Sequence, residues 1–268
     1  MNLTEYVSFA AKLADEAKVK NGLHDYFLMH RDRLWQTACH FDIWSLRDKR
    51  ILEIGPFFSY TPFALQDQGN KVSVLEGDDP AVYPLEPLYH DRRIDFATCD
   101  LFRSFGSPSM KDHRLPFPDD QFDVIYCWET MEHFNFNPVG FVRDLRRILK
   151  PGGEACITVP NVAKLEKRIR LFVGGSIATP VADYRHFYDY SGGVFLGFHW
   201  REYTLEELVD LFKSQEFQVV SARHLLTFQH YPDTSMARRL WRLMLRSSFF
   251  LLPSLGSLCA IRAKKSTV

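Results

Sequence analysis

The chain has 268 residues, of which 46% are hydrophobic and 25% charged, a composition of folded globular proteins that excludes disordered and collagen-like classes. Its 33 basic and 33 acidic residues balance, so no overall positive field draws it to nucleic acid, and we expect no nucleic-acid partner. The five cysteines are scattered without metal-ligand spacing, which predicts no metal site and buried thiols in a reducing compartment.

Residues 1–48 carry apolar side chains at helical spacing. Tyr6, Phe9 and Leu13 fall on one helix face, and Tyr26, Phe27 and His30 on another. The first residues lack the apolar core of a signal peptide, and the most apolar stretch, 247–261, is too short and too interrupted to span a bilayer. We therefore expect an N-terminal helical layer over 1–48, no transmembrane segment and a cytoplasmic protein.

From Arg50 onward, short apolar runs alternate with helical segments, which is typical of a parallel sheet wound with helices. The predicted helices are 61–68, 138–149 and 204–214, the last opening with the capping-type sequence TLEE. Seven strands are predicted, at 50–54, 71–76, 93–98, 122–127, 154–159, 217–222 and 257–263. The pattern predicts an α/β, doubly wound, mostly parallel seven-stranded sheet in a single domain, 1–268.

Acidic residues follow three successive strands. In such sheets ligands bind beyond the carboxyl ends of the strands. Gly55 allows a sharp turn after the first strand, and Glu76 follows the second, 21 residues later, near the separation at which an acid reaches a bound nucleotide's ribose. Asp100 follows the third strand, and CWETMEHF, 127–134, follows the fourth. One such acid is more often a helix cap or a solvated loop residue, but three together favour a nucleotide site.

The stretch from Arg50 to Asn161 resembles the core of a class I S-adenosylmethionine-dependent methyltransferase. The matching motifs are ILEIG, VLEGD, CDLF, LPFPDDQFDVIYCWETMEHF and DLRRILKPGGEACITVPN. The resemblance implies a cofactor-binding core over 50–161, substrate-side segments and the last strands over 162–268, and an antiparallel last strand. It also implies S-adenosyl-L-methionine as the cofactor.

Site residues are carried over from the same resemblance. The cofactor's methionine part is expected near the first turn, its ribose at the second strand, its adenine at the third, and its methyl group beside the fourth. The corresponding residues are Glu53, Gly55 and Pro56, then Glu76 and Gly77, then Asp100 and Leu101, and finally Trp128. His133 is the first candidate for a general base, with Tyr184, His186 and His199 behind it.

Two departures from the family pattern concern the turn and the segment after Asp100. Phe57 and Ser59 stand where the family often has further glycines. A dinucleotide's pyrophosphate would require a second glycine, whereas S-adenosylmethionine has no pyrophosphate. Of Phe57 and Phe58, one is expected to pack in the core, and the other either packs or forms an aromatic wall near the sulfonium. Residues 104–113 form an insertion that is expected to be a loop.

Between the last two predicted strands lies MARRLWRLMLRSSFFLL, 236–252. Its arginines fall mostly on one helix face beside apolar residues. Such a basic amphipathic helix is typical of membrane surfaces, anionic ligands or partner binding, and the alternative is a helix packed on the domain with solvated arginines. Peripheral membrane contact through 236–252 and an amphiphilic acceptor, such as a glycan or lipid-linked intermediate, are hypotheses from this segment.

The expected function is transfer of a methyl group from S-adenosylmethionine to a small-molecule acceptor, at an oxygen atom. The sequence after the fourth strand is CWET rather than the NPPY-like motif of enzymes that methylate amino groups of bases or glutamine. The alternative is a methyltransferase-fold scaffold, or a cofactor-binding protein, without catalysis.

Overall fold

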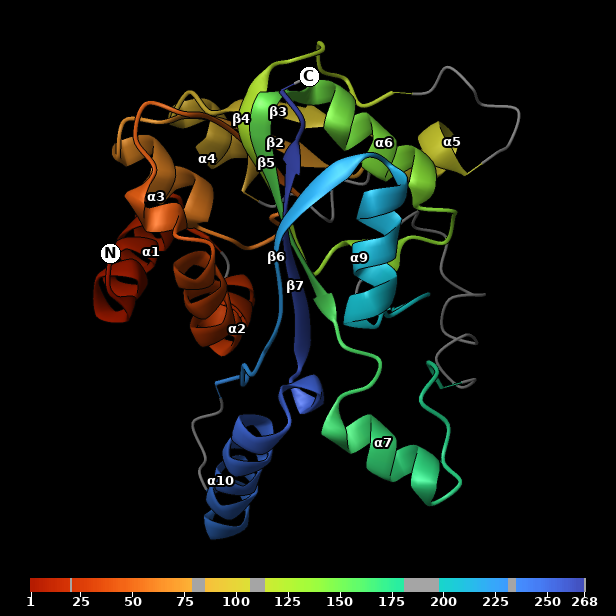
Figure 1. Ribbon diagram of the computed structural model, residues 1–268. Helices are drawn as coiled ribbons and strands as arrows, with labels where there is room; N and C mark the ends of the chain where they lie inside the picture. The colour runs from red at the N-terminus through yellow and green to blue at the C-terminus, as the bar shows by residue number, and fades with distance from the viewer. Residues whose placement is uncertain (20, 79–84, 107–113, 181–197, 231–234, 268) are drawn as a thin grey trace.

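A computed structural model describes residues 1–19, 21–78, 85–106, 114–180, 198–230 and 235–267 (Figure 1). The sheet has seven strands in the order β3-β2-β1-β4-β5-β7-β6. Parallel pairing joins the strands from β3 to β5, and β7 runs antiparallel to both of its neighbours, as expected from the sequence. The strands are β1 Arg50–Ile54, β2 Lys71–Glu76, β3 Asp95–Thr98, β4 Phe122–Trp128, β5 Leu149–Pro160, β6 Phe217–Leu225 and β7 Leu258–Lys265.

Helices cover both faces of the sheet (Figure 1). One face carries α1 Leu3–Glu16, α2 Asn21–His40, the short turn η1 Ile43–Ser45, α3 Thr61–Asp67 and α4 Glu86–Asp91. The other carries α5 Leu101–Phe105, η3 Met131–His133, α6 Val139–Ile148 and α9 Leu205–Ser214. Two further helices, α7 Leu165–Phe172 and α10 Met236–Leu251, project from one end of the sheet, and η4 Pro253–Leu255 follows α10.

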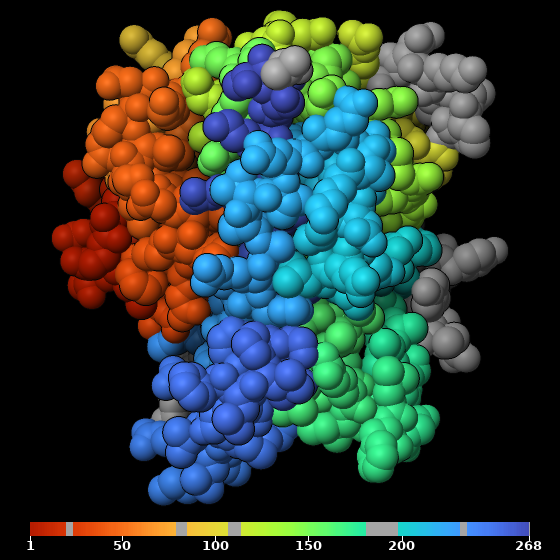
Figure 2. Space-filling model, in the orientation of Figure 1, coloured from red at the N-terminus to blue at the C-terminus, as the bar shows by residue number. Residues whose placement is uncertain are grey.

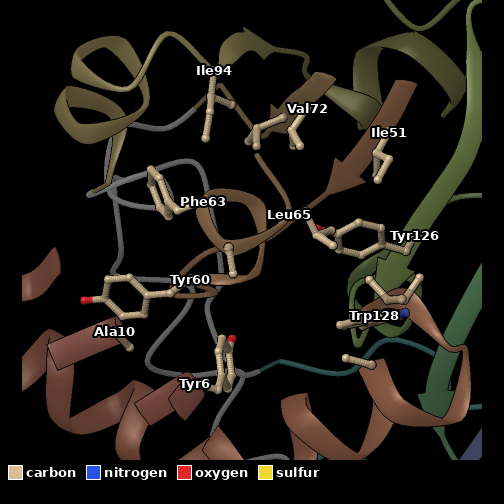
Figure 3. Close-up of a cluster of buried hydrophobic side chains, with 14 of the residues drawn as sticks. Tyr6, Ala10, Ile51, Tyr60, Phe63, Leu65, Val72, Ile94, Tyr126 and Trp128 are labelled. Atoms are coloured by element: carbon tan, nitrogen blue, oxygen red, sulfur yellow. The ribbon is translucent and has the colours of Figure 1, made fainter. Parts of the chain in front are cut away.

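The central strands are buried on both faces, which explains their near-continuous apolar sequences. In β1, Ile51 points into the core under α1 to α4, whereas Leu52 and Ile54 point into the core under α6 and α9. Figure 3 shows part of the first core, where rings from α1, the α3 region and β4 meet. The rings of Tyr6 and Phe27, with centroids 5.4 Å apart, fix the N-terminal helices to this core.

The predicted elements lie close to the observed ones, and two strands begin two or more residues away from their predicted starts. The third strand begins at Asp95 rather than 93, because Arg93 adopts a left-handed backbone conformation with φ of +58°. The fifth strand begins at Leu149 rather than 154, because the helix before it ends at Ile148 and Leu149 already pairs with Phe122. The turn KPGG therefore lies inside β5 as an irregular segment, with Gly152 at a φ of +78°.

Two smaller expectations were also tested. The predicted capping box of α9 is present, with Thr204 Oγ1 accepting from the Glu207 N–H at 3.2 Å. All five cysteines are free thiols, but the expectation that all are buried was wrong, because Cys39 is exposed at the end of α2. In the described ranges, every helix is either too short or too polar to cross a bilayer.

Candidate active site

A cavity of about 1060 Å³ lies at the carboxyl ends of β1, β2 and β4. Strand order reverses between β1 and β4, so the cavity occupies the place where doubly wound sheets bind ligands. Helix α2 lines it through Tyr26, Phe27, Met29, His30, Arg33 and Leu34. The residues expected at the cofactor and the first candidate for a general base also line it: Glu53, Gly55, Pro56, Glu76, Gly77, Asp100, Leu101, Trp128 and His133.

The turn after β1 depends on a glycine. Gly55 has a φ of +67°, and its N–H donates to the Leu75 carbonyl at 2.8 Å. A Cβ at this position would lie 2.6 Å from Thr130 Oγ1 at the end of β4. Gly55 thus serves both a left-handed backbone and a close approach between neighbouring strand ends.

Phe57, at the next glycine position of the family pattern, also has a left-handed backbone, with φ of +50°. This conformation costs a non-glycine residue about 1–2 kcal/mol. The Phe57 N–H donates to Glu76 Oε1 at 2.7 Å, a bond to a carboxyl group that offsets part of this cost. The turn therefore keeps the backbone shape that a glycine would give, and holds the Glu76 side chain.

The two phenylalanines of the turn have different environments. Phe58 is buried, which confirms packing for one of the pair. Phe57 is half-buried, and its ring meets Phe58 and Tyr26 of α2 at centroid distances of 4.3 and 5.3 Å. Both residues line the cavity, so an aromatic wall extends from this turn to α2.

Two buried acids face the cavity from β1 and β2. Burial raises the pKa of Glu53 to about 8, although hydrogen bonds from Tyr126, at 2.6 Å, and Ser59 act in the opposite direction. Burial also raises the pKa of Glu76, against the hydrogen bond from the Phe57 N–H. Within the described residues neither acid has an ion-pair partner, so a ligand that carries positive charge would stabilise the ionised form that burial disfavours.

Asp100 lines the cavity but also caps a helix. Its carboxylate accepts from the Arg103 N–H at 2.9 Å at the start of α5, and Arg103 Nε lies 3.2 Å from it. The capping explanation for an acid at a strand end thus holds here, alongside its position in the cavity. Leu101 and Phe102 follow it into the cavity lining.

At the end of β4, Trp128 is buried with its Nε1 unpaired in the described structure, and Glu129 follows with a φ of +54°. Arg33 Nη1 of α2 lies 3.2 Å from Glu129 Oε2, an ion pair that joins α2 to the strand end. The pair was not expected from the sequence, because its members are 96 residues apart.

His133 presents one ring nitrogen for proton transfer. Its Nδ1 lies 2.7 Å from the Phe198 carbonyl oxygen, and since a carbonyl only accepts, Nδ1 carries the hydrogen and Nε2 carries a lone pair. Burial and, to a smaller extent, the nearby His199 together lower the pKa of His133 to about 4. The imidazole is therefore unprotonated at neutral pH.

Residues 27–222 match a family model described as a methyltransferase domain. The chain belongs to this methyltransferase family. A Mycolicibacterium smegmatis protein named as a probable S-adenosylmethionine-dependent methyltransferase is 24% identical over 195 residues, which are 73% of this chain and 60% of that protein. A Pseudomonas aeruginosa ubiquinone biosynthesis O-methyltransferase is 29% identical over 119 residues, 44% of this chain and 47% of that protein. The chain thus spans about half the length of these curated relatives.

Solved structures share the fold of this methyltransferase. A chain of the complex between the Haloferax volcanii Trm112 methyltransferase activator and a methyltransferase superposes with a TM-score of 0.58, at 16% identity, covering 98% of both chains. An S-adenosylmethionine-dependent methyltransferase of Aquifex aeolicus superposes with a TM-score of 0.53, at 12% identity, covering 91% of this chain and 97% of that one. The predictions of the class I fold and of S-adenosylmethionine as the family's methyl donor are confirmed.

The methyltransferase site contains a group of side chains that sequence analysis did not assemble. Glu132, His133 and His199 each offer a ligand atom, and these atoms lie within 4.8 Å of one another. Two imidazoles and a carboxylate are a ligand set that divalent transition metals accept, so this group could hold a cation where the sequence predicted no metal site. His199 Nδ1 lies 2.9 Å from Glu202 Oε1. The other two base candidates, Tyr184 and His186, lie outside the described residues.

Helix α2 is the part of the methyltransferase site that sequence reasoning missed. Tyr26 and His30 were expected only on one face of an N-terminal helix, and no role was expected for Arg33. All three line the cavity. The only signal in the sequence was a polar residue, His30, on an otherwise apolar face.

Proposed function

We propose that the chain transfers a methyl group from S-adenosylmethionine to an oxygen atom of a small-molecule acceptor. The observation that supports this best is the pairing, in one cavity, of two buried acids without cationic partners in the described structure and an imidazole with a free Nε2 lone pair. The acids favour a positively charged donor, and the imidazole can accept a proton from an acceptor.

In this proposal the donor lies along the carboxyl ends of β1 to β4. When bound, S-adenosylmethionine supplies a methyl group activated by its sulfonium charge. Glu53 and Gly55 would lie at its amino-acid part, and Glu76 at its ribose. Asp100 and Leu101 would lie at its adenine, and Trp128 beside the methyl group. Oε1 of Glu76 accepts from the Phe57 N–H, and its second oxygen would accept from a ribose hydroxyl.

His133 is the proposed proton acceptor. Its Nδ1–H is held by the Phe198 carbonyl, which fixes the ring so that Nε2 carries the lone pair. A base must come within about 2.6–3.2 Å of the proton that it removes. The acceptor hydroxyl is therefore expected between His133 and the β4 end of the cavity, with Trp128 and Thr130 as neighbours.

The weak basicity of His133 bears on the acceptor class. An imidazole whose pKa is lowered to about 4 removes a proton efficiently only from an acidic group. A phenolic or comparably acidic hydroxyl is therefore a better acceptor than a simple alcohol. The relative named as a ubiquinone biosynthesis O-methyltransferase supports oxygen as the atom that is methylated.

The proposal is tested with the purified chain, isotope-labelled S-adenosylmethionine and cell extract separated into small-molecule, lipid, protein and RNA fractions. Label in a small molecule, at an oxygen atom, is the expected result. Label in the RNA fraction would overturn the acceptor class, and it is included because another relative, from Sulfurimonas denitrificans, is named as a tRNA U34 carboxymethyltransferase. Calorimetry with the cofactor and its demethylated product separates an enzyme from a scaffold, because a scaffold need bind neither.

A further inference from the structure

The two projecting helices have apolar side chains in an unusual place. Twelve of the seventeen large hydrophobic side chains that are exposed in the described residues belong to α7, α10 and the residue that follows each of them. Phe172 at the end of α7 is 91% exposed, and Phe250 and Leu251 at the end of α10 are 86% and 80% exposed. We define this surface, residues 165–173 and 236–252, as the projecting end.

Neither helix is covered by the rest of the described fold. Leu245 is the one buried residue of α10, and α7 has none. Helices of this length gain most of their stability from burying an apolar face. The alternative of a helix packed on the domain is therefore disfavoured for α10, because its apolar side chains other than Leu245 lack a cover within the described structure.

The bases of the helices are nevertheless firmly held. Arg168 of α7 donates to the Ser254 hydroxyl, at 3.0 Å, just after α10. Arg242 of α10 donates to the Gln229 carbonyl at 2.8 Å, and its guanidinium lies 5.4 Å from the centre of the Phe228 ring. His230, which follows Gln229, donates its N–H to the Met29 carbonyl of α2 at 2.7 Å. The projection is thus an anchored part of the fold.

The charge of the projecting end differs from that of the whole chain. The chain has equal numbers of acidic and basic residues, whereas α10 contains four arginines and no acid. Helix α7 has Lys167, Arg168 and Arg170 against a single acid, Glu166. A surface that combines exposed aromatic and aliphatic side chains with an excess of arginine suits the headgroup region of an anionic bilayer.

The shape of the projecting end also favours a bilayer. Figures 1 and 2 show α7 and α10 extending from the same end of the molecule. A protein partner needs a complementary surface, whereas a bilayer accepts apolar side chains to a depth of about 5–10 Å whatever their arrangement. A second copy of the chain is disfavoured, because a two-fold contact would bring the arginine-rich α10 helices together.

We propose that the projecting end binds the surface of anionic membranes and that the cavity receives its acceptor from the bilayer. Both helices follow the carboxyl ends of parallel strands, α7 after β5 and α10 after β6, which is the sheet edge that holds the cavity. Gln229, whose carbonyl accepts from Arg242, lines the cavity itself. The arrangement fits an amphiphilic acceptor that stays near the lipid surface.

Vesicle co-sedimentation of the full chain tests this inference. Binding is expected to vesicles that contain phosphatidylglycerol, with much weaker binding to pure phosphatidylcholine and a decrease as salt is raised. The triple variant Phe172→Asn, Phe250→Asn and Leu251→Asn should bind about 100-fold more weakly. The double variant Arg238→Gln and Arg239→Gln should bind about 30-fold more weakly.

Val220→Asn is the matched control, because Val220 is an exposed apolar residue of β6 outside the projecting end, and it should bind as the unmodified chain does. Circular dichroism establishes that each variant is folded. Failure of the unmodified chain to bind anionic vesicles overturns the proposal. Unchanged vesicle binding by the triple variant also overturns it. A third contrary result would be that the unmodified chain forms a dimer in light scattering, binds no vesicles, and becomes a monomer in the triple variant. The acceptor's origin rests on the proposed methyl transfer, but vesicle binding is measured without cofactor, so each can fail alone.

Discussion

The cavity and the projecting end lie on the same edge of the sheet, and both depart from the rule that charged side chains are exposed and large apolar side chains are buried. The cavity buries acids, with Glu53 3% and Glu76 5% exposed, whereas the projecting end exposes large apolar side chains such as Phe250. Each departure costs stability that ordinary packing would have kept. Under the two proposals made above, this edge would accept two ligands, a charged cofactor in the cavity and a membrane surface beside it.

The comparison also separates the two regions experimentally. Substitutions in the cavity should change cofactor binding or turnover and leave vesicle binding as it is. Substitutions in the projecting end should do the reverse.

The largest effect on cofactor binding is expected for Gly55→Ala. The new Cβ would lie 2.6 Å from Thr130 Oγ1, so either the turn or the end of β4 must move, and the cavity wall moves with it. Displacements near 1 Å in an active site can lower the catalytic rate about 100-fold. We expect calorimetry to show at least that loss in S-adenosylmethionine affinity, with unchanged vesicle binding.

Gly69→Ala is the control for Gly55→Ala. Gly69 also has a left-handed backbone, with φ of +89°, but no atom lies within 4 Å of an added Cβ. It imposes a similar backbone penalty without the contact, so cofactor affinity should be kept. Equal affinities for the two variants would show that the approach to Thr130 does not shape the site.

His133→Asn should lower kcat by about 10²–10⁴-fold and leave cofactor affinity within about twofold. The Asn side-chain amide can replace Nδ1–H as donor to the Phe198 carbonyl, while the position of Nε2 is left empty. Steady-state kinetics with the acceptor that the labelling experiment identifies gives the measurement. A change in KM alone would mean that His133 positions the acceptor, and an unchanged kcat would exclude it as the base.

Glu76→Gln should weaken S-adenosylmethionine binding by about 10- to 100-fold, the range for losing a hydrogen bond to a charged group. The Gln carbonyl can still accept from the Phe57 N–H, so the turn is preserved. Glu86→Gln, which changes a half-exposed acid of α4, is the matched control. Similar affinities for the two variants would remove Glu76 from the proposed ribose contact.

Sequence analysis predicted the cavity better than the projecting end for a physical reason. Gly55 and Glu76 follow apolar runs whose parallel pairing sends them to one edge, so strand order alone brings them together. The contribution of Arg33 was not predictable, because it depends on how α2 crosses that edge. The amphipathic pattern of 236–252 is the same whether the helix packs on a domain or on a membrane, so only the observed exposure separates the two.

The last prediction concerns the pH dependence of stability and reports on the burial of Glu53. Its pKa is raised to about 8 in the folded chain, against about 4.5 when exposed. Between these values the folded chain keeps the proton that the unfolded chain has released. Unfolding therefore becomes easier as pH rises, by at most about 1.4 kcal/mol per pH unit from this group. The contribution is complete below the unfolded pKa and is lost as pH rises through the folded pKa.

Glu53→Gln isolates this contribution. The variant keeps an acceptor for the Tyr126 hydroxyl, and the other groups that interact with Glu53, namely Glu76, Tyr6 and Tyr89, stay in place. The free energy of unfolding is measured in urea at several pH values between about 5 and about 8, the interval between the unfolded and folded pKa values. As pH rises, it should decline less steeply for the variant than for the unmodified chain. The Arg238→Gln and Arg239→Gln double variant, altered only at the projecting end, should decline as the unmodified chain does. Parallel curves for Glu53→Gln and the unmodified chain would mean that Glu53 is ionised in the folded protein, and the cavity would then carry a fixed negative charge before any cofactor binds.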